Sequence, residues 1–133
     1  MPDQSALRGQ LKDIEARARA NTFFRQEIET GEHTQIVLMS IPPAGEIGME
    51  VHPDTDQVLY LVEGEGKVIL DGQERPFKKH DLVLVHAGTW HNFVNTGKKD
   101  LKIITTYSPP HHKPGTVHKT KAEADAAEAA EHH

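Results

Sequence analysis

The stretch that decides the fold runs from Gly48 to Gly66 and reads Gly-Met-Glu-Val-His-Pro-Asp-Thr-Asp-Gln-Val-Leu-Tyr-Leu-Val-Glu-Gly-Glu-Gly. Glu50 and His52 are two residues apart, so in extended backbone their side chains leave the same face. The Pro-Asp-Thr-Asp run after them favours a turn, and the β-branched and aromatic residues that follow predict a strand beginning at Gln57. We therefore expect Gln57 to return beside His52.

A second segment supplies another imidazole. It runs from His86 to Asn95, reads His-Ala-Gly-Thr-Trp-His-Asn-Phe-Val-Asn, and carries His91 just after a turn. Burying a carboxylate together with two imidazoles is costly unless a cation lies between them. Carboxylate and imidazole both bind zinc, manganese, iron and nickel. The predicted metal-binding set is Glu50, His52, Gln57 and His91.

The first segment resembles the first motif of the cupin superfamily. That motif has two His with one residue between them, then four residues and a Glu, then six residues and a Gly. The corresponding residues here are Glu50, His52, Gln57 and Gly64. A carboxylate thus replaces the first His, and an amide, which is a weak neutral donor, replaces the Glu. Gln57 is either a fourth ligand or a hydrogen-bond partner that orients an imidazole.

The second segment resembles the second cupin motif, which reads Pro-x-Gly, two residues, His, three residues and Asn. Gly88, His91 and Asn95 match this pattern, and His86 stands where the family has Pro. Upstream, His80 replaces a Gly that the family usually has at a turn. We still expect a corner between two strands at His80, and we expect Asn95 to bridge a turn to the backbone.

The resemblance covers roughly residues 35–107 and implies an all-β fold, the double-stranded β-helix or jelly-roll barrel of cupins. We expect an N-terminal helix in residues 1–21, the barrel in 22–108, and a helical or disordered C-terminal tail in 109–133. Ser5 is the expected cap of the N-terminal helix. Its apolar stripe is Leu7, Leu11, Ile14 and Ala18.

The pattern of strands fits this fold. The strand expected at 34–41 is apolar on both faces, which favours a core on one side and a helix or second subunit on the other. Cupins commonly pair at a sheet edge, so the resemblance implies a homodimer. Tyr60 should point away from the metal, because it lies an odd number of residues from Gln57. Strand pairing should end at the two prolines after Ser108. The expected strands are 22–28, 34–41, 57–62, 67–70, 73–77, 82–85 and 101–107.

Composition excludes several classes of function. The 133 residues are enough for one domain. The absence of cysteine excludes disulfides, thiolate metal sites and cysteine nucleophiles. A formal charge of −5 with interspersed signs argues against a nucleic-acid surface. No apolar run approaches the ~20 residues of a membrane span, and no export signal is apparent, so we expect a cytoplasmic protein.

Three further histidines are candidates for catalysis. His86 is expected at the barrel mouth or under a loop, although a lone His is more often structural. His111 and His112 follow a Ser-Pro-Pro run, and if the tail folds over the barrel opening, one of them is placed to act as general acid or base. The alternative is a solvated tail. His132 and His133 are interpreted as part of an expression tag or of a ragged terminus.

These observations favour a divalent-metal cupin, with zinc, manganese, iron or nickel as the cofactor, that acts on a small polar molecule. Small cupins similar to this chain perform isomerase or lyase chemistry on sugar-like or keto-acid substrates. The first alternative is a non-haem iron dioxygenase, because two His and one carboxylate with open positions also describe such sites. The second is a barrel that binds a small ligand without turnover.

Overall fold

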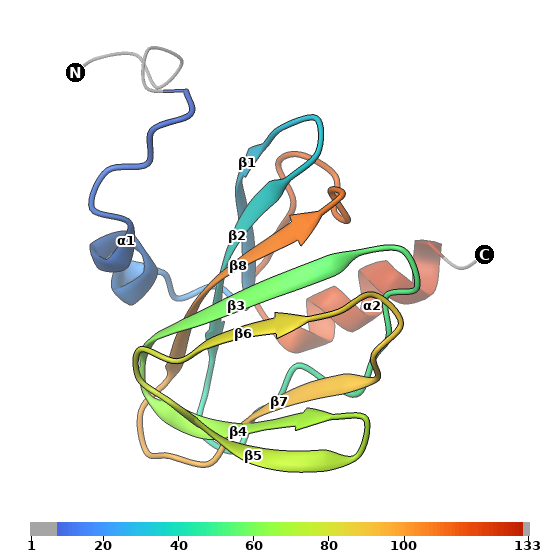
Figure 1. Cartoon of the computed structure of the whole chain (residues 1–133). Coiled ribbons are helices and arrows are strands. Elements are labelled where there is room, and N and C mark those ends of the chain that lie inside the picture. The colour runs from blue at the N-terminus through green and yellow to red at the C-terminus, as the bar shows by residue number, and fades with distance from the viewer. Residues whose placement is uncertain (1–7, 132–133) are drawn as a thin grey trace.

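The protein is a two-sheet barrel, described by a computed structural model over residues 8–131 (Figure 1). The six-stranded sheet has the order β6-β3-β8-β2-β1-β9, and the three-stranded sheet has the order β5-β4-β7. The predicted jelly roll is therefore confirmed. The strands are β1 (Arg25–Thr30), β2 (Gln35–Ile41), β3 (Asp56–Glu63), β4 (Glu65–Leu70), β5 (Gln73–Lys78), β6 (Leu82–Val85), β7 (His91–Asn95), β8 (Leu101–Ser108) and β9 (Val117–His118).

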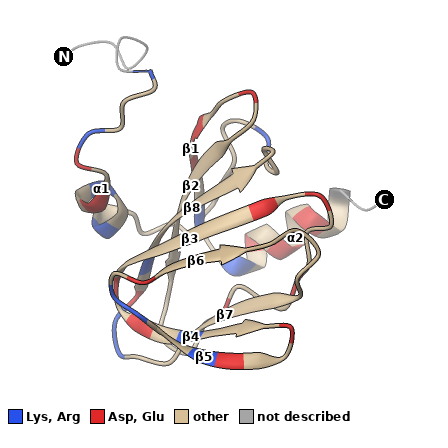
Figure 2. Ribbon diagram, in the orientation of Figure 1, with Lys and Arg blue, Asp and Glu red and all other residues tan. Residues whose placement is uncertain are grey.

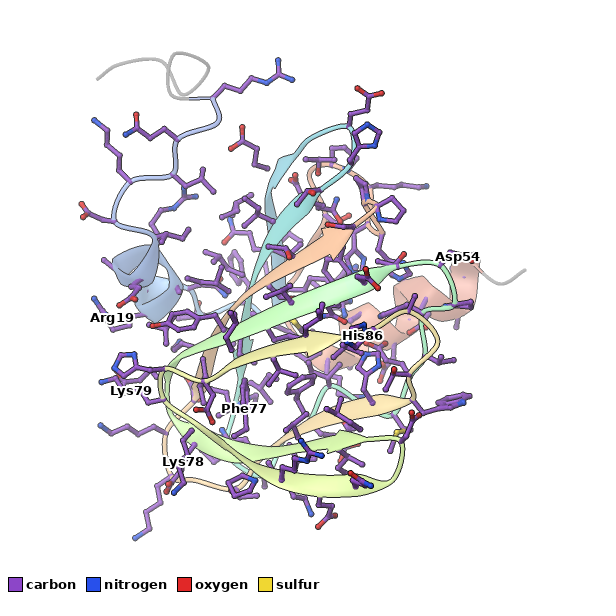
Figure 3. The ribbon with its side chains drawn as sticks, viewed as in Figure 1. Arg19, Asp54, Phe77, Lys78, Lys79 and His86 are labelled. Carbon is purple, nitrogen blue, oxygen red and sulfur yellow. The ribbon has the colours of Figure 1, made fainter. Side chains whose placement is uncertain are left out.

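The core lies between the two sheets. Val37, Met39 and Ile41 alternate along β2 and are fully buried against the three-stranded sheet. From that sheet, Phe77 and Phe93 meet edge to face with their ring centroids 5.1 Å apart. Figure 3 shows Phe77 pointing into the barrel. This apolar filling occupies one end of the barrel and leaves polar side chains at the other.

The outer face of β2 is apolar because helix α1 (Ile14–Ala20) covers it. Ala18 is fully buried against Leu38 and Val62. The helix begins later than predicted, because Asp13 has a φ of 50°, outside the helical region. The predicted cap at Ser5 lies outside the described residues. Since α1 accounts for the second apolar face, that face no longer argues for a dimer, and the homodimer remains a prediction.

The expected corner at His80 is present between β5 and β6. His80 has a φ of 78°, which is the left-handed conformation that Gly adopts most easily. Its backbone N–H donates to the carbonyl of Leu61 at 2.8 Å, and the Asp81 side chain accepts from the N–H of Lys78 at 2.8 Å. These hydrogen bonds hold the turn without glycine. The motif residue Gly64, by contrast, could not carry a side chain, since a Cβ would lie 2.7 Å from the carbonyl oxygen of Asp100.

The C-terminal tail corrects one prediction. Strand pairing does not end at the prolines after Ser108, because β9 pairs antiparallel with the edge strand β1. The residues of β9 lie beyond the last proline and can donate to a ladder. Helix α2 (Lys121–Glu131) follows. Oγ1 of Thr120 caps it by accepting from the N–H of Glu123 at 3.1 Å, and the Glu123 carboxylate accepts in turn from the N–H of Lys119, a variant of the capping box. As far as Glu131, the tail therefore forms a short strand and a helix against the barrel.

Charged residues are distributed over the whole molecule. Figure 2 shows Lys and Arg interspersed with Asp and Glu on both sheets and both helices. No helix within residues 8–131 is long and apolar enough to span a membrane.

Candidate metal centre

The centre is built where a loop segment pairs with the start of β7. Glu50 and His91 exchange both of their backbone hydrogen bonds, at 3.0 and 2.9 Å, although Glu50 belongs to no regular strand. Residues opposed in this way project their side chains from the same face. This face points into the barrel, since Phe93 is two residues further along β7 and fully buried. The backbone thus brings a carboxylate and an imidazole together.

His52 completes the cluster from the same loop. Its carbonyl accepts a hydrogen bond of 2.9 Å from the N–H of Gly88, which links the first motif to the turn of the second. The Oε1 atom of Glu50 lies 3.3 Å from Nε2 of His52 and 3.6 Å from Nε2 of His91. The three potential ligand atoms lie within 4.8 Å of one another. Three of the four predicted ligands are therefore neighbours.

The protonation pattern of these imidazoles suits a cation. Nδ1 of His91 lies 2.9 Å from the carbonyl oxygen of Thr89, and because a carbonyl only accepts, this nitrogen carries the proton. In the neutral ring Nε2 then presents a lone pair. The Nε2 atoms of His52 and His91 are buried and without a hydrogen-bond partner. A divalent cation fits two such nitrogens facing a carboxylate.

The carboxyl group of Glu50 is ionised at neutral pH. Burial alone would raise its pKa. In the metal-free cluster, hydrogen bonds from His52 and His91 and the positive charge of these imidazoles when they carry both ring protons outweigh burial and hold the pKa of Glu50 well below its usual range, and a bound cation would take the place of those protons. Only the deprotonated form binds a metal. The electrostatics of the cluster thus prepare Glu50 to be an anionic ligand.

Gln57 is buried on β3, but it does not line the cavity described below. Its amide nitrogen donates to Oγ1 of Thr105 at 3.0 Å, which leaves the amide oxygen buried without a hydrogen-bond partner. The oxygen is therefore available to accept a hydrogen bond or to bind a cation. Its role as a fourth ligand stays a prediction.

Two other motif residues lie away from the cluster. Asn95 is structural, as expected: its amide donates to the carbonyls of Ile41 and Lys99 at 2.9 and 2.8 Å, and its oxygen accepts from Gly97 at 2.9 Å. His86 is exposed just past the end of β6, where Figure 3 labels it, and it does not line the cavity.

A cavity of about 310 Å³ opens beside the cluster. The loop at residues 50–53, which carries Glu50 and His52, forms part of its wall, and residues of β1, β8 and the C-terminal tail form the rest. The tail residues His111 and His112 both line it. The tail therefore folds over the opening, as one of the two interpretations of the sequence predicts, and is not simply solvated. The polar and charged lining residues that sequence reasoning missed are Arg25, Tyr107, Lys113, Thr116, His118 and Glu128.

Aromatic stacking fixes the tail at this cavity. The ring of His111 lies 4.4 Å from that of His52 and stacks at 5.6 Å on Tyr107, measured between centroids. Burial, with the charges of Arg25 and His111, lowers the pKa of His112 to about 3. Burial raises the pKa of Tyr107 to about 12. Tyr107 is therefore a neutral donor at neutral pH, and His112 is a neutral imidazole.

Similarity to known proteins agrees with this geometry. YrkC, an uncharacterized protein of Bacillus subtilis, is 41% identical in an alignment of 122 positions that covers 87% of this chain and 66% of YrkC. The chain spans about half to two thirds of the lengths of its curated relatives. A crystal structure of a Bacillus halodurans protein, also 41% identical, superposes with a TM-score of 0.88 over 90% of this chain and 95% of that one.

A more distant structure is that of a Thermotoga maritima protein described as a predicted oxalate decarboxylase. It is 25% identical, with a TM-score of 0.56 over 59% of this chain and 69% of that one. A family model for the Cupin domain matches residues 37–107, which contain both motifs and all three clustered ligands. With its jelly roll, its paired motifs and this match, the chain belongs to the cupin family.

Proposed function

We propose that this protein is a metal-dependent enzyme that binds one divalent cation through Glu50, His52 and His91. The observation that carries the proposal is the pair of buried, unpartnered Nε2 atoms on either side of an ionised carboxylate. Without a cation, this arrangement requires a protonated imidazole in a buried site, which is costly. The adjoining cavity leaves room for a small molecule.

The reaction that fits these groups is proton transfer on a small polar substrate, as in an isomerase or lyase. A bound divalent cation would polarise a carbonyl or hydroxyl oxygen of such a substrate. The Tyr107 hydroxyl, which stays protonated, would donate a hydrogen bond to negative charge developing on the substrate. His111, in ring contact with His52, is placed to take up or deliver the proton. The description of the Thermotoga protein as a predicted decarboxylase is compatible with lyase chemistry.

A non-haem iron oxygenase is the second candidate, because two imidazoles and one carboxylate are the ligand set of that class. Elemental analysis of protein purified without a histidine tag tests both enzyme candidates at once. Stoichiometric zinc, manganese or nickel, with turnover in the absence of oxygen, would support proton transfer. Stoichiometric iron with oxygen uptake would support the oxygenase.

A third outcome of that analysis is a protein without metal. If no stoichiometric metal is found and added metal leaves the melting temperature unchanged, both enzyme proposals are wrong. The barrel would then be a small-ligand-binding protein without turnover.

A further inference from the structure

Arg25 is one of four charged side chains that line the cavity, together with Glu50, Lys113 and Glu128, and the proposed proton transfer does not use it. It lies on β1, is 8% exposed, and lines the same cavity as Glu50 and His52. One terminal nitrogen of its guanidinium lies 3.2 Å from Nδ1 of His118. Its Nε atom is buried and has no hydrogen-bond partner. A permanently charged group is therefore buried at the cavity with an unused donor.

Among the described residues, no ion pair neutralises this charge, although the carboxylate of Glu128 lines the same cavity. The guanidinium carbon is 5.3 Å from the centre of the Phe24 ring, and this contact compensates only a small part of the lost hydration. A buried guanidinium is normally paired, and its fork of donors matches a carboxylate. The guanidinium of Arg25 is therefore suited to bind an anion that is not part of the chain.

The fold holds Arg25 in place on the same wall as the metal cluster. Arg25 and His118 are directly opposed in the β1–β9 pair, so the tail orients the guanidinium. Tyr107 adjoins both ends of the wall: its ring is 6.1 Å from that of His52, and its hydroxyl is subject to the charges of both Arg25 and Glu50. One small molecule in the cavity can therefore contact Arg25 at one end and the metal cluster at the other.

We propose that Arg25 is the anion-binding end of the cavity and that the substrate is a carboxylic acid of a few carbon atoms. Its carboxylate would bind the guanidinium of Arg25, and its keto or hydroxy oxygen would face Glu50, His52 and His91. A cavity of about 310 Å³ is at the small end of ligand sites. A divalent cation with one ionised ligand leaves one positive charge, and Arg25 adds another. Lys113 and Glu128, which also line the cavity, carry opposite charges that offset each other, so an acid fits better than a neutral sugar. The placement of the second oxygen depends on the proposed metal function, whereas the contact with Arg25 does not.

Calorimetric titration with two matched probes tests this proposal. Pyruvate carries the carboxylate and a neighbouring carbonyl, and pyruvamide has almost the same shape without the charge. Each is titrated into the manganese-loaded full chain and into the chain after metal removal with a chelator. We expect saturable pyruvate binding in both forms, tighter with manganese, and binding of pyruvamide weaker by at least about tenfold.

Three variants identify the group responsible. Arg25→Gln should weaken pyruvate binding by about 10- to 100-fold and leave pyruvamide binding and manganese stoichiometry unchanged. Arg25→Lys keeps the charge without the planar fork and should give a smaller loss, which also covers the case in which Arg25→Gln does not fold. Arg19→Gln is the control, since it removes the same charge from the exposed outer side of α1 (Figure 3).

The outcomes separate this inference from the proposed function. Equal pyruvate binding by the wild type and both Arg25 variants, equal binding of pyruvamide and pyruvate, or no pyruvate binding at all would overturn the anion site, whatever the metal result. Failure to take up manganese, with pyruvate binding that still depends on Arg25, would overturn the metal function and leave the anion site standing.

Discussion

Replacing Glu50 by Gln should abolish the stabilisation that a divalent metal gives to this protein. The amide keeps the shape of the side chain and removes the only anion among the three clustered ligands. Because His52 and His91 are nearly inaccessible to solvent, the interaction of Glu50 with a cation between them is little screened by water or salt. The loss should therefore be large for so small a change.

The magnitude follows from binding linkage. A metal present at about 100 times its dissociation constant stabilises the folded state by about 2.7 kcal/mol. For a domain of this size that corresponds to a rise in melting temperature on the order of 10 °C. In Glu50→Gln the rise should fall below about 2 °C, because two neutral imidazoles bind a divalent cation only weakly at the same concentration.

Thermal denaturation with and without added manganese, zinc, iron or nickel measures this effect. Glu32→Gln is the matched control, since the Glu32 side chain is 87% exposed and lies far from the cluster in sequence. Histidines of the unfolded chain also bind metal and reduce the apparent stabilisation. They are the same in both variants, so the difference between the two variants reports the site alone.

A buried ion pair is the competing explanation of the cluster, and it predicts the opposite pattern. If a protonated imidazole already neutralises Glu50, then Glu50→Gln should cost the metal-free protein about 3–5 kcal/mol. Added metal should then leave the melting temperature of the wild type unchanged. Observation of both results would refute the metal centre.

Three substitutions elsewhere test packing and electrostatics. Asn95→Ala should cost about 2–4 kcal/mol in urea unfolding, because Asn95 makes three hydrogen bonds to backbone groups; a cost below about 0.5 kcal/mol would contradict this. Ala18→Asp should lower the free energy of unfolding by about 3 kcal/mol, since it buries a charge under α1, and an unchanged melting temperature would argue against this packing. Folding lowers the pKa of His112 from 6.5 to about 3. Between these two pH values the unfolded chain binds a proton at His112 that the folded chain does not bind. The free energy of unfolding is therefore highest above about pH 6.5 and falls as the pH decreases toward 3. His112→Leu should therefore reduce the loss of unfolding free energy between about pH 6.5 and about pH 4 by about 3 kcal/mol in metal-free protein, and an identical pH profile would disprove it.

Features set by short-range rules were predictable from the sequence. Strand parity placed Tyr60 away from the metal, and the structure has its hydroxyl on the outer side, 3.2 Å from Glu15 and 3.0 Å from His80. The spacing of Glu50 and His52 and the turn before His91 likewise predicted the cluster. Such features depend on the alternation of side chains along a strand and on the residues that favour turns. Both act over a few residues and in the same way in most sheets.

The cavity wall was not predictable in this way, because it depends on pairing between chain ends. Arg25 and His118 are 93 residues apart and meet only through the β1–β9 ladder. An arginine in a polar strand is normally predicted to be exposed to solvent. No residue near Arg25 in the sequence indicates that the C-terminal tail will cover its side chain. Tyr107, the residue before the end of β8, has a similar ambiguity, because an aromatic side chain at that position suits either the core or a cavity wall.

One local signal would nonetheless have placed the tail. Thr120 and Glu123 have the spacing of a capping box, which predicts that a helix starts immediately after Thr120. Gly115, at a φ of 84°, marks a turn just before. Between that turn and the helix only a short extended segment can fit, and an open sheet edge is the place where such a segment pairs. These signals together predict that the tail forms a strand followed by a helix. The strand then brings His118 to the edge strand β1, which carries Arg25.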